Sequence, residues 1–248
     1  MKQHLFFDLD DTLVHCNIYF HEVLNEFAAR MCETFASSGL TREAVLAKQS
    51  EIDIAGVRIH GFKSDHFPQS LVDTYRHFCG RFGESPSAEE ERSLWRLGLS
   101  VYERDVEPYP HMEETLESLA AQGHVLHLYT GGDAFVQRRK IRRLRLERYF
   151  DRRVYIRTHK RLDDLRAILA EVGCDPAHTW MIGNSVRTDV LPALACGLNV
   201  LYMKRPNEWV YNVLPIDVPP RGVFLTLQSL ADIPPVIRRH AEAAGAGS

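Results

Sequence analysis

The chain has 248 residues and a formal net charge of −3, and its composition, 45% hydrophobic and 25% charged, is typical of a globular protein with a sizeable core. This charge balance gives no electrostatic reason to expect nucleic acid or an anionic membrane as a partner. No run approaches the roughly 20 apolar residues that span a bilayer, and we expect no signal peptide. Five scattered cysteines without a CxxC pair predict reduced thiols in a cytoplasmic protein.

The first predicted element is a short apolar strand, residues 5–8, and a long helical segment follows it. Between residues 15 and 105, apolar side chains recur at spacings that are typical of one face of a helix. Further such stripes lie within 71–82 and 94–101, and the first is formed by Phe20, Leu24, Phe27, Met31 and Phe35. Residues 15–105 are therefore predicted to form an inserted helical bundle, with loops at 56–61 and 60–68.

From residue 106 onward, apolar runs of strand length alternate with helical segments that end at glycine. The predicted strands are 125–129, 154–156, 179–182, 200–203 and 223–225, and the predicted helices include 112–121, 162–172 and 190–195. This alternation predicts an α/β fold with a Rossmann-like, doubly wound parallel sheet. We assign 1–14 and 106–240 to this core domain, 15–105 to the helical domain, and the small residues of 241–248 to a disordered tail.

The strongest local signal is the run Asp8-Leu9-Asp10-Asp11-Thr12 at the end of the first strand. Ligands of open α/β sheets bind beyond the carboxyl ends of the strands, and acids buried there need a cation or hydrogen bonds to offset their desolvation. Mg²⁺ favours carboxylate oxygens, and a carboxylate can itself act as a nucleophile. Because an acidic turn after a strand explains the same residues, further signals are needed.

Three further signals follow the later strands, and each is weak alone. Thr130-Gly131-Gly132 offers a hydroxyl and open backbone N–H groups, which suit a phosphate. Lys160 would neutralise the acids and a transferring phosphoryl group. Gly183-Asn184-Ser185 again ends a strand with oxygen ligands, and Asp189 follows one turn later. The carboxyl ends of parallel strands share one sheet edge, so we expect the four signals to converge.

Together these four motifs resemble those of the haloacid dehalogenase superfamily of hydrolases, over residues 1–14 and 106–230. The resemblance implies that Asp8 is the nucleophile and Asp10 the general acid/base. It implies that Thr130 and Lys160 complete the catalytic set and, with the Gly131 amide, bind the phosphoryl group. It also implies a Mg²⁺ cofactor, whose ligands are drawn from Asp8, Asp10 (through its backbone carbonyl), Asn184 and Asp189. The implied reaction is hydrolysis of a small-molecule phosphomonoester through an aspartyl-phosphate.

The fourth motif departs from the family pattern at Asn184, where an aspartate is usual. An amide oxygen can coordinate Mg²⁺, but it contributes no formal charge. Either Asn184 binds the metal and Asp189 supports it through water, or Asp189 binds the metal directly. We prefer the first arrangement.

Other activities are open at this point. A phosphomutase uses the same four motifs. Dehalogenases of the superfamily attack a halogenated acid without Mg²⁺ and generally lack the second aspartate, which is Asp10 here. An inert binding protein would keep the fold without the chemistry, and Asn184 is the one departure that points that way. The sequence leaves the substrate and the oligomeric state undetermined.

Two further segments have two interpretations each. The inserted bundle resembles the helical cap of one branch of the superfamily. Polar side chains in or beside its predicted loops would either contact the leaving group of the substrate or be exposed; they are Arg58, His60, Lys63 and His66. Residues 138–148 hold six arginines and one lysine, which would bind an anionic partner or form a solvated helix face. We prefer the solvated face, because Val136, Ile141, Leu144 and Tyr149 keep a partial apolar stripe. The resemblance supports this, since a polar helix with Gln137 and Lys140 commonly follows the second motif in this superfamily.

Overall fold

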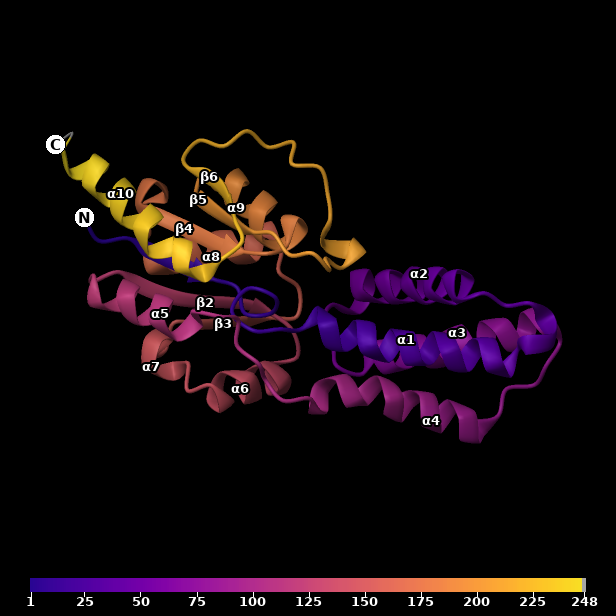
Figure 1. Cartoon of the computed structure of the whole chain (residues 1–248). Coiled ribbons are helices and arrows are strands. Elements are labelled where there is room, and N and C mark those ends of the chain that lie inside the picture. Colours follow the sequence, from indigo (N-terminus) through magenta and orange to yellow (C-terminus); the bar gives the residue numbers. More distant parts are fainter. Residues whose placement is uncertain (247–248) are drawn as a thin grey trace. The chain divides into compact units, whose positions relative to one another are not determined.

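The computed structural model describes residues 1–246, which form two compact units. One unit comprises Met1–Asn17 and the residues from Val106 onward, and the other comprises Ile18–Asp105. The first unit contains the β-sheet and the second is made of helices (Figure 1). In the part of the chain that the structure describes, no helix combines the length and apolar character needed to cross a membrane. The five cysteines are free thiols.

The first unit is built on six parallel strands in the spatial order β3-β2-β1-β4-β5-β6. The strands are β1 (His4–Phe7), β2 (Val125–Gly131), β3 (Val154–Arg157), β4 (Thr179–Gly183), β5 (Asn199–Met203) and β6 (Phe224–Leu227). This order confirms the doubly wound parallel sheet expected from the sequence. Each predicted strand lies within two residues of its observed limits.

Helices cover both faces of this sheet, so side chains on both sides of its central strands are buried. One hydrophobic cluster involves α5 (Met112–Ala121), α6 (Ala134–Arg143), α7 (Glu147–Phe150) and α10 (Ile233–Ala246). The opposite cluster involves α8 (Leu162–Val172) and α9 (Leu191–Ala195). The remaining short helices are the 3₁₀ turns Ala36–Ser38, Ser100–Glu103, Pro176–His178, Val210–Asn212 and Leu230–Asp232 and a π-helical turn, Val186–Val190.

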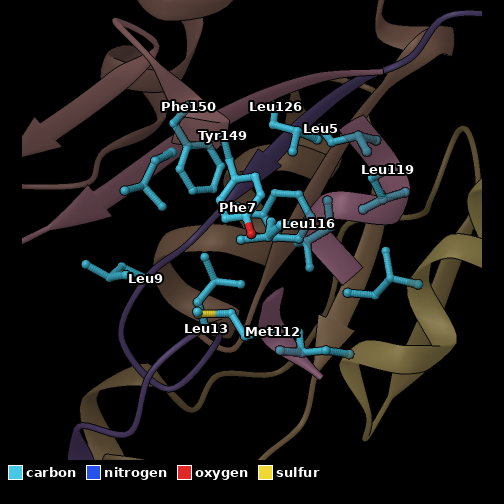
Figure 2. Close-up of a cluster of buried hydrophobic side chains, with 14 of the residues drawn as sticks. Leu5, Phe7, Leu9, Leu13, Met112, Leu116, Leu119, Leu126, Tyr149 and Phe150 are labelled. Atoms are coloured by element: carbon cyan, nitrogen blue, oxygen red, sulfur yellow. The ribbon is translucent and has the colours of Figure 1, made fainter. Parts of the chain in front are cut away.

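Strand β1 shows how the alternation of side chains fills these two clusters. Leu5 and Phe7 pack in the first cluster, and Phe6 between them packs in the second, because successive side chains of a strand point to opposite faces. Figure 2 shows Leu5 and Phe7 among side chains that include Leu116 and Leu119 of α5. The strand is therefore held on both faces by fully buried apolar contacts.

The position of β1 in the sheet brings the sequence motifs together. It lies between β2 and β4, with Phe7 opposite both Leu128 and Ile182. The chain winds outward from β1 through β2 and β3, then crosses back to β4 on the other side. A crevice at such a reversal of strand order is where open α/β sheets bind ligands. The acids after β1 lie at this point.

The second unit contains four longer helices, as the helical stripes predict. They are α1 (Asn17–Thr34), α2 (Arg42–His60), α3 (His66–Phe82) and α4 (Ala88–Leu99). Its hydrophobic core includes most of the side chains of the predicted stripes, among them Phe27, Met31, Phe35, Leu71 and Phe78.

The predicted loop at 56–61 is wrong, because α2 continues to His60. The predicted loop at 60–68 is confirmed only for residues 61–65, because α3 begins at His66. Gly56 is helical, and its missing side chain makes room for the His66 ring: a Cβ there would lie 1.8 Å from His66 Cε1. The ring nitrogen Nε2 of His66 lies 2.9 Å from the backbone oxygen of Asp53. This glycine serves a helix contact and does not mark a turn, and His66 is engaged within the helical unit.

The predicted disorder of 241–248 is also wrong for most of that segment. Helix α10 extends to Ala246, and Ala241 is buried in the described structure. Alanine has the highest helix propensity, so the alanines of this segment extend the helix. Residues 247 and 248 lie outside the described part of the chain.

The close contact between α3 and α4 predicts that two glycines in these helices tolerate alanine differently. A Cβ on Gly98 would lie 2.5 Å from Pro68 Cα, whereas a Cβ on Gly80 would meet nothing within 4 Å. We expect Gly98→Ala to lower the free energy of unfolding by about 1–3 kcal/mol, because the two helices must separate. Gly80→Ala should raise it by about 0.5–1 kcal/mol, because alanine loses less backbone entropy in a helix.

Urea denaturation of both variants and the unsubstituted protein measures these changes. Gly80→Ala is the matched control, since it makes the same chemical change in a helix of the same unit. Equal effects of the two substitutions would contradict the close packing at Gly98.

Candidate active site

The four sequence motifs meet at the carboxyl edge of the sheet, all within the first unit. Residues 8–12 follow β1, 130–132 end β2 and continue into the next turn, Lys160 follows β3, and 184–189 follow β4. All the predicted site residues therefore belong to adjacent strand ends. Their side chains form two groups, one around Asp8 and one around Asp10.

Lys160 is the centre of the first group. Its Nζ donates to Oδ1 of Asp8 at 2.8 Å and makes a short hydrogen bond to Oδ1 of Asp189. The same nitrogen lies 4.8 Å from the centroid of the Tyr129 ring. All three charged side chains are nearly inaccessible: the lysine is 2% exposed, Asp8 9% and Asp189 1%. One buried cation thus serves two buried anions, and the group keeps one uncompensated negative charge.

The pKa values of Asp8 and Lys160 reflect burial and the neighbouring charges. Burial raises the pKa of Asp8 above its usual value, Asp189 and Asp10 act in the same direction, and Lys160 opposes them. Burial would lower the pKa of Lys160, but the charges of Asp189 and Asp8 outweigh it and raise that pKa. Lys160 is therefore the ammonium form at neutral pH.

Asp189 is fixed by its backbone surroundings as well as by Lys160. Its Oδ2 accepts a hydrogen bond from the Ser185 backbone N–H at 3.0 Å. A Cβ on Gly183 would lie 2.3 Å from that same oxygen, so only glycine permits this approach at the end of β4. Both carboxylate oxygens of Asp189 are engaged in this way.

Asn184 is buried and is oriented toward the first strand. The Thr12 hydroxyl lies 3.3 Å from Oδ2 of Asp8 and 3.4 Å from Oδ1 of Asn184. A hydroxyl has one proton to donate, so it cannot satisfy both oxygens, and both distances are long for an O–H donor. Oδ2 of Asp8 and Oδ1 of Asn184 therefore both lie near the Thr12 hydroxyl, which bonds them only weakly.

This donor set fits a hard divalent cation. Within residues 1–246, no group of three or more histidine, cysteine, aspartate or glutamate side chains could hold a metal ion. A cation at this edge would therefore need a mixed set of oxygens, with the Asp8 carboxylate and the Asn184 amide as side-chain donors. Oxygen ligands suit Mg²⁺, and the uncompensated negative charge of the buried group favours a cation.

Asp10 belongs to the second group and turns toward α6. Its Oδ1 accepts from Lys140 Nζ at 2.6 Å, and its Oδ2 accepts from Gln137 Nε2 at 2.9 Å. Gln137 Nε2 also lies 2.7 Å from the Thr130 hydroxyl and 2.9 Å from the Gly131 backbone oxygen. This amide thus joins the second acid to the predicted phosphate-binding hydroxyl.

The turn that carries Asp10 and Asp11 is tied to distant parts of the unit. Asp11 has a positive φ of 54°, and its carboxylate accepts from the backbone N–H groups of Cys16 and Asn17. Burial raises the pKa of Asp11 to about 6. Arg205 donates to the backbone oxygens of Asp11 and Thr12 at 2.9 and 3.1 Å. These contacts hold the turn in its unusual backbone conformation.

Comparison with known proteins identifies the family of this chain. A family model described as a hydrolase, haloacid dehalogenase-like hydrolase, matches residues 2–197. The chain belongs to this family.

Relatives of this hydrolase include enzymes of more than one kind. A glyceraldehyde 3-phosphate phosphatase of Methanothermobacter thermautotrophicus is 26% identical over 211 residues, which is 81% of this chain and 85% of the relative. A haloacid dehalogenase-like family hydrolase from Xanthomonas campestris has a TM-score of 0.79 at 23% identity, covering 100% of this chain and 95% of that one. The L-2-haloacid dehalogenase from Xanthobacter autotrophicus has a TM-score of 0.54 at 15% identity, covering 96% and 99%. The two structures share the fold.

Sequence reasoning did not assign Gln137 or Lys140 to the site of this hydrolase. Residues 138–148, which include Lys140, were interpreted as a solvated helix face. The available signal was their spacing: residues three apart lie on the same face of a helix. That face of α6 is directed to Asp10.

The buried charge group predicts the effect of removing its one cation. We expect Lys160→Met to lower the free energy of unfolding of this hydrolase by about 3–5 kcal/mol at about pH 8, because two carboxylates then remain buried without a cation. The loss should shrink toward about pH 5. Folding raises the pKa of Asp8, so its ionised form costs stability, and that cost disappears as Asp8 binds a proton at lower pH.

Urea denaturation at several pH values, with a chelator present, measures this dependence. The exposed Lys204 supplies the control variant Lys204→Met, which should match the unsubstituted protein at every pH. A pH-independent loss in Lys160→Met would show that its ammonium does not compensate the two acids.

Proposed function

We propose that this hydrolase cleaves small-molecule phosphate monoesters in a Mg²⁺-dependent reaction, with Asp8 as nucleophile and an aspartyl-phosphate as intermediate. The observation that carries the proposal is the second acid. The charge of Asp10 is close enough to Asp8 to help raise the pKa of Asp8. Donors from α6 contact both carboxylate oxygens of Asp10. The alcohol part of a phosphate ester leaves as an alkoxide, which needs a proton donor, whereas a halide leaving group needs none.

The first half of the reaction transfers the phosphoryl group to the protein. A carboxylate oxygen of Asp8 bonds to phosphorus as the bond from phosphorus to the ester oxygen breaks. The protonated carboxyl of Asp10 gives its proton to the departing oxygen, and an alcohol is released. Lys160, Thr130 and the Gly131 N–H stabilise the charge on the phosphoryl oxygens.

The second half returns Asp8 to its starting form. The Asp10 carboxylate takes a proton from water as the water oxygen bonds to phosphorus. The bond between phosphorus and Asp8 breaks, and inorganic phosphate leaves. Asp10 is then protonated for the next cycle, so one residue serves as acid and base in turn.

Mg²⁺ would be held by the Asp8 carboxylate, the Asn184 amide oxygen and the Asp10 backbone carbonyl. Its charge would offset that of the phosphate and of the buried acids when it is bound. Asp189 supports this arrangement rather than coordinating the metal, since Lys160 and the Ser185 N–H occupy its two oxygens.

The proposed partner is a small phosphorylated metabolite rather than nucleic acid or a membrane. The phosphatase relative acts on glyceraldehyde 3-phosphate, by its name, which supports a substrate of this size. Its 26% identity does not extend that substrate to this chain.

The test is hydrolysis of 4-nitrophenyl phosphate by the purified protein with Mg²⁺. We expect Asp8→Asn to lower the rate by at least about 10³-fold, because the amide is a poor nucleophile. Chelation of the metal should lower it by at least about 10²-fold, and added Mg²⁺ should restore it. Trapping of radiolabelled phosphate on the unsubstituted protein, and not on Asp8→Asn, would identify the intermediate.

The control variant is Asp163→Asn, whose side chain is 91% exposed and pairs with Arg166 on the surface. It should keep the full rate. Equal rates for Asp8→Asn and the control would overturn the proposal. Release of chloride from 2-chloropropionate, with no phosphate release, would instead identify a dehalogenase.

A further inference from the structure

Helix α6 contacts the second acid through two side chains, Gln137 and Lys140, which we call the α6 donor pair. The two donors occupy different oxygens of Asp10, at 2.9 and 2.6 Å. Gln137 is fully buried, and the Lys140 side chain is 14% exposed. A carboxylate held at both oxygens cannot rotate without losing a charge-assisted hydrogen bond.

The helix that carries this pair is itself fixed at the end of β2. The Asp133 carboxylate accepts from the backbone N–H groups of Phe135 and Val136, which caps the first turn. A Cβ on Gly132 would lie 2.9 Å from Gln137 Cδ, so the helix packs closely on the turn before it. Both donors are therefore set by the backbone that also carries Thr130.

Lys140 is the charged member of the pair. Burial would lower its pKa, but the charge and hydrogen bond of Asp10, together with the neighbouring Cys16 and Asp11, outweigh that effect and raise it. The ammonium thus faces Asp10 as a permanent cation that is separate from Lys160. Asp8 and Asp10 are therefore contacted by different lysines, Asp8 by Lys160 and Asp10 by Lys140.

We propose that Gln137 and Lys140 are positioning residues that hold the Asp10 carboxyl for proton transfer to the leaving-group oxygen. This inference rests on the proposed function and adds two residues to it. Neither residue exchanges a proton: Asp10 loses its proton to the alkoxide, and the resulting carboxylate keeps its hydrogen bonds to the pair. Gln137 also donates to the Thr130 oxygen, so one amide sets the acid relative to the phosphate-binding hydroxyl.

This role predicts a dependence on the leaving group that a purely structural role would not produce. Nitrophenolate is a stable anion that departs with little help from an acid, whereas phenolate is more basic and depends on proton donation. We expect Lys140→Met to lower kcat/KM by about 10²-fold for phenyl phosphate and by no more than about 5-fold for 4-nitrophenyl phosphate. The ratio kcat/KM reports the steps up to release of the phenol, where the acid acts.

Three further variants complete the experiment. Lys140→Arg keeps the charge and should recover most of the activity on phenyl phosphate. Gln137→Met should show the same preference for the nitrophenyl ester, which keeps the test valid if Lys140→Met does not fold. The exposed Arg142 lies on the same helix, and Arg142→Met should stay within about 2-fold of the unsubstituted protein for both esters.

A double-mutant cycle with Asp10→Asn separates positioning from general stability. If the donor pair acts through Asp10, Lys140→Met should add less than about 2-fold to the loss on phenyl phosphate in that background. Thermal unfolding midpoints confirm that each variant is folded.

The outcomes are distinct. Equal losses on the two esters, or full additivity with Asp10→Asn, would overturn the positioning role while leaving the phosphatase intact. Absence of hydrolysis of either ester by the unsubstituted protein would overturn the proposed function, and this inference with it.

Discussion

The ammonium of Lys160 between two buried carboxylates is the contact on which the rest of the site depends. Without it, the nearly buried carboxylates of Asp8 and Asp189 would repel each other, and burying either without a cation would cost several kcal/mol. With it, the ends of β1, β3 and β4 are joined by charge as well as by the sheet. The backbone at Gly183 accommodates this contact, because no side chain separates it from Asp189.

The two acids of the first motif have different surroundings, although one residue separates them. Asp8 shares its lysine with a second carboxylate and is almost fully buried, whereas Asp10 has Lys140 to itself and is 26% exposed. In the proposed reaction the first acid must attack phosphorus and the second must exchange protons with an alkoxide and water. Pairs of carboxyl groups with unequal environments are how enzymes divide such tasks.

Most of the sheet could be predicted from the sequence, because its apolar runs have strand length and alternate with helices that end at glycine. The convergence of Asp8, Thr130 and Lys160 followed from one rule, that parallel strands share their carboxyl edge. The contacts of Lys140 could not be predicted, since a lysine among six arginines gives no compositional sign of burial. Gly56 was misleading for a different reason: glycine marks turns and close helix contacts alike, and only the position of the His66 ring distinguishes them.

The hydrogen bonds of Arg205 to the turn after β1 have a consequence for the order in which the protein folds during synthesis. Its guanidinium reaches the backbone oxygens of Asp11 and Thr12 from more than 190 positions later in the chain, and also contacts that of Gln228. Strand β1 is synthesised first, yet both of its neighbours in the sheet are synthesised more than 100 residues later. A ribosome-bound nascent chain therefore carries Asp8 and the turn after β1 long before Arg205 can hold that turn, and the sheet around β1 is completed late in synthesis.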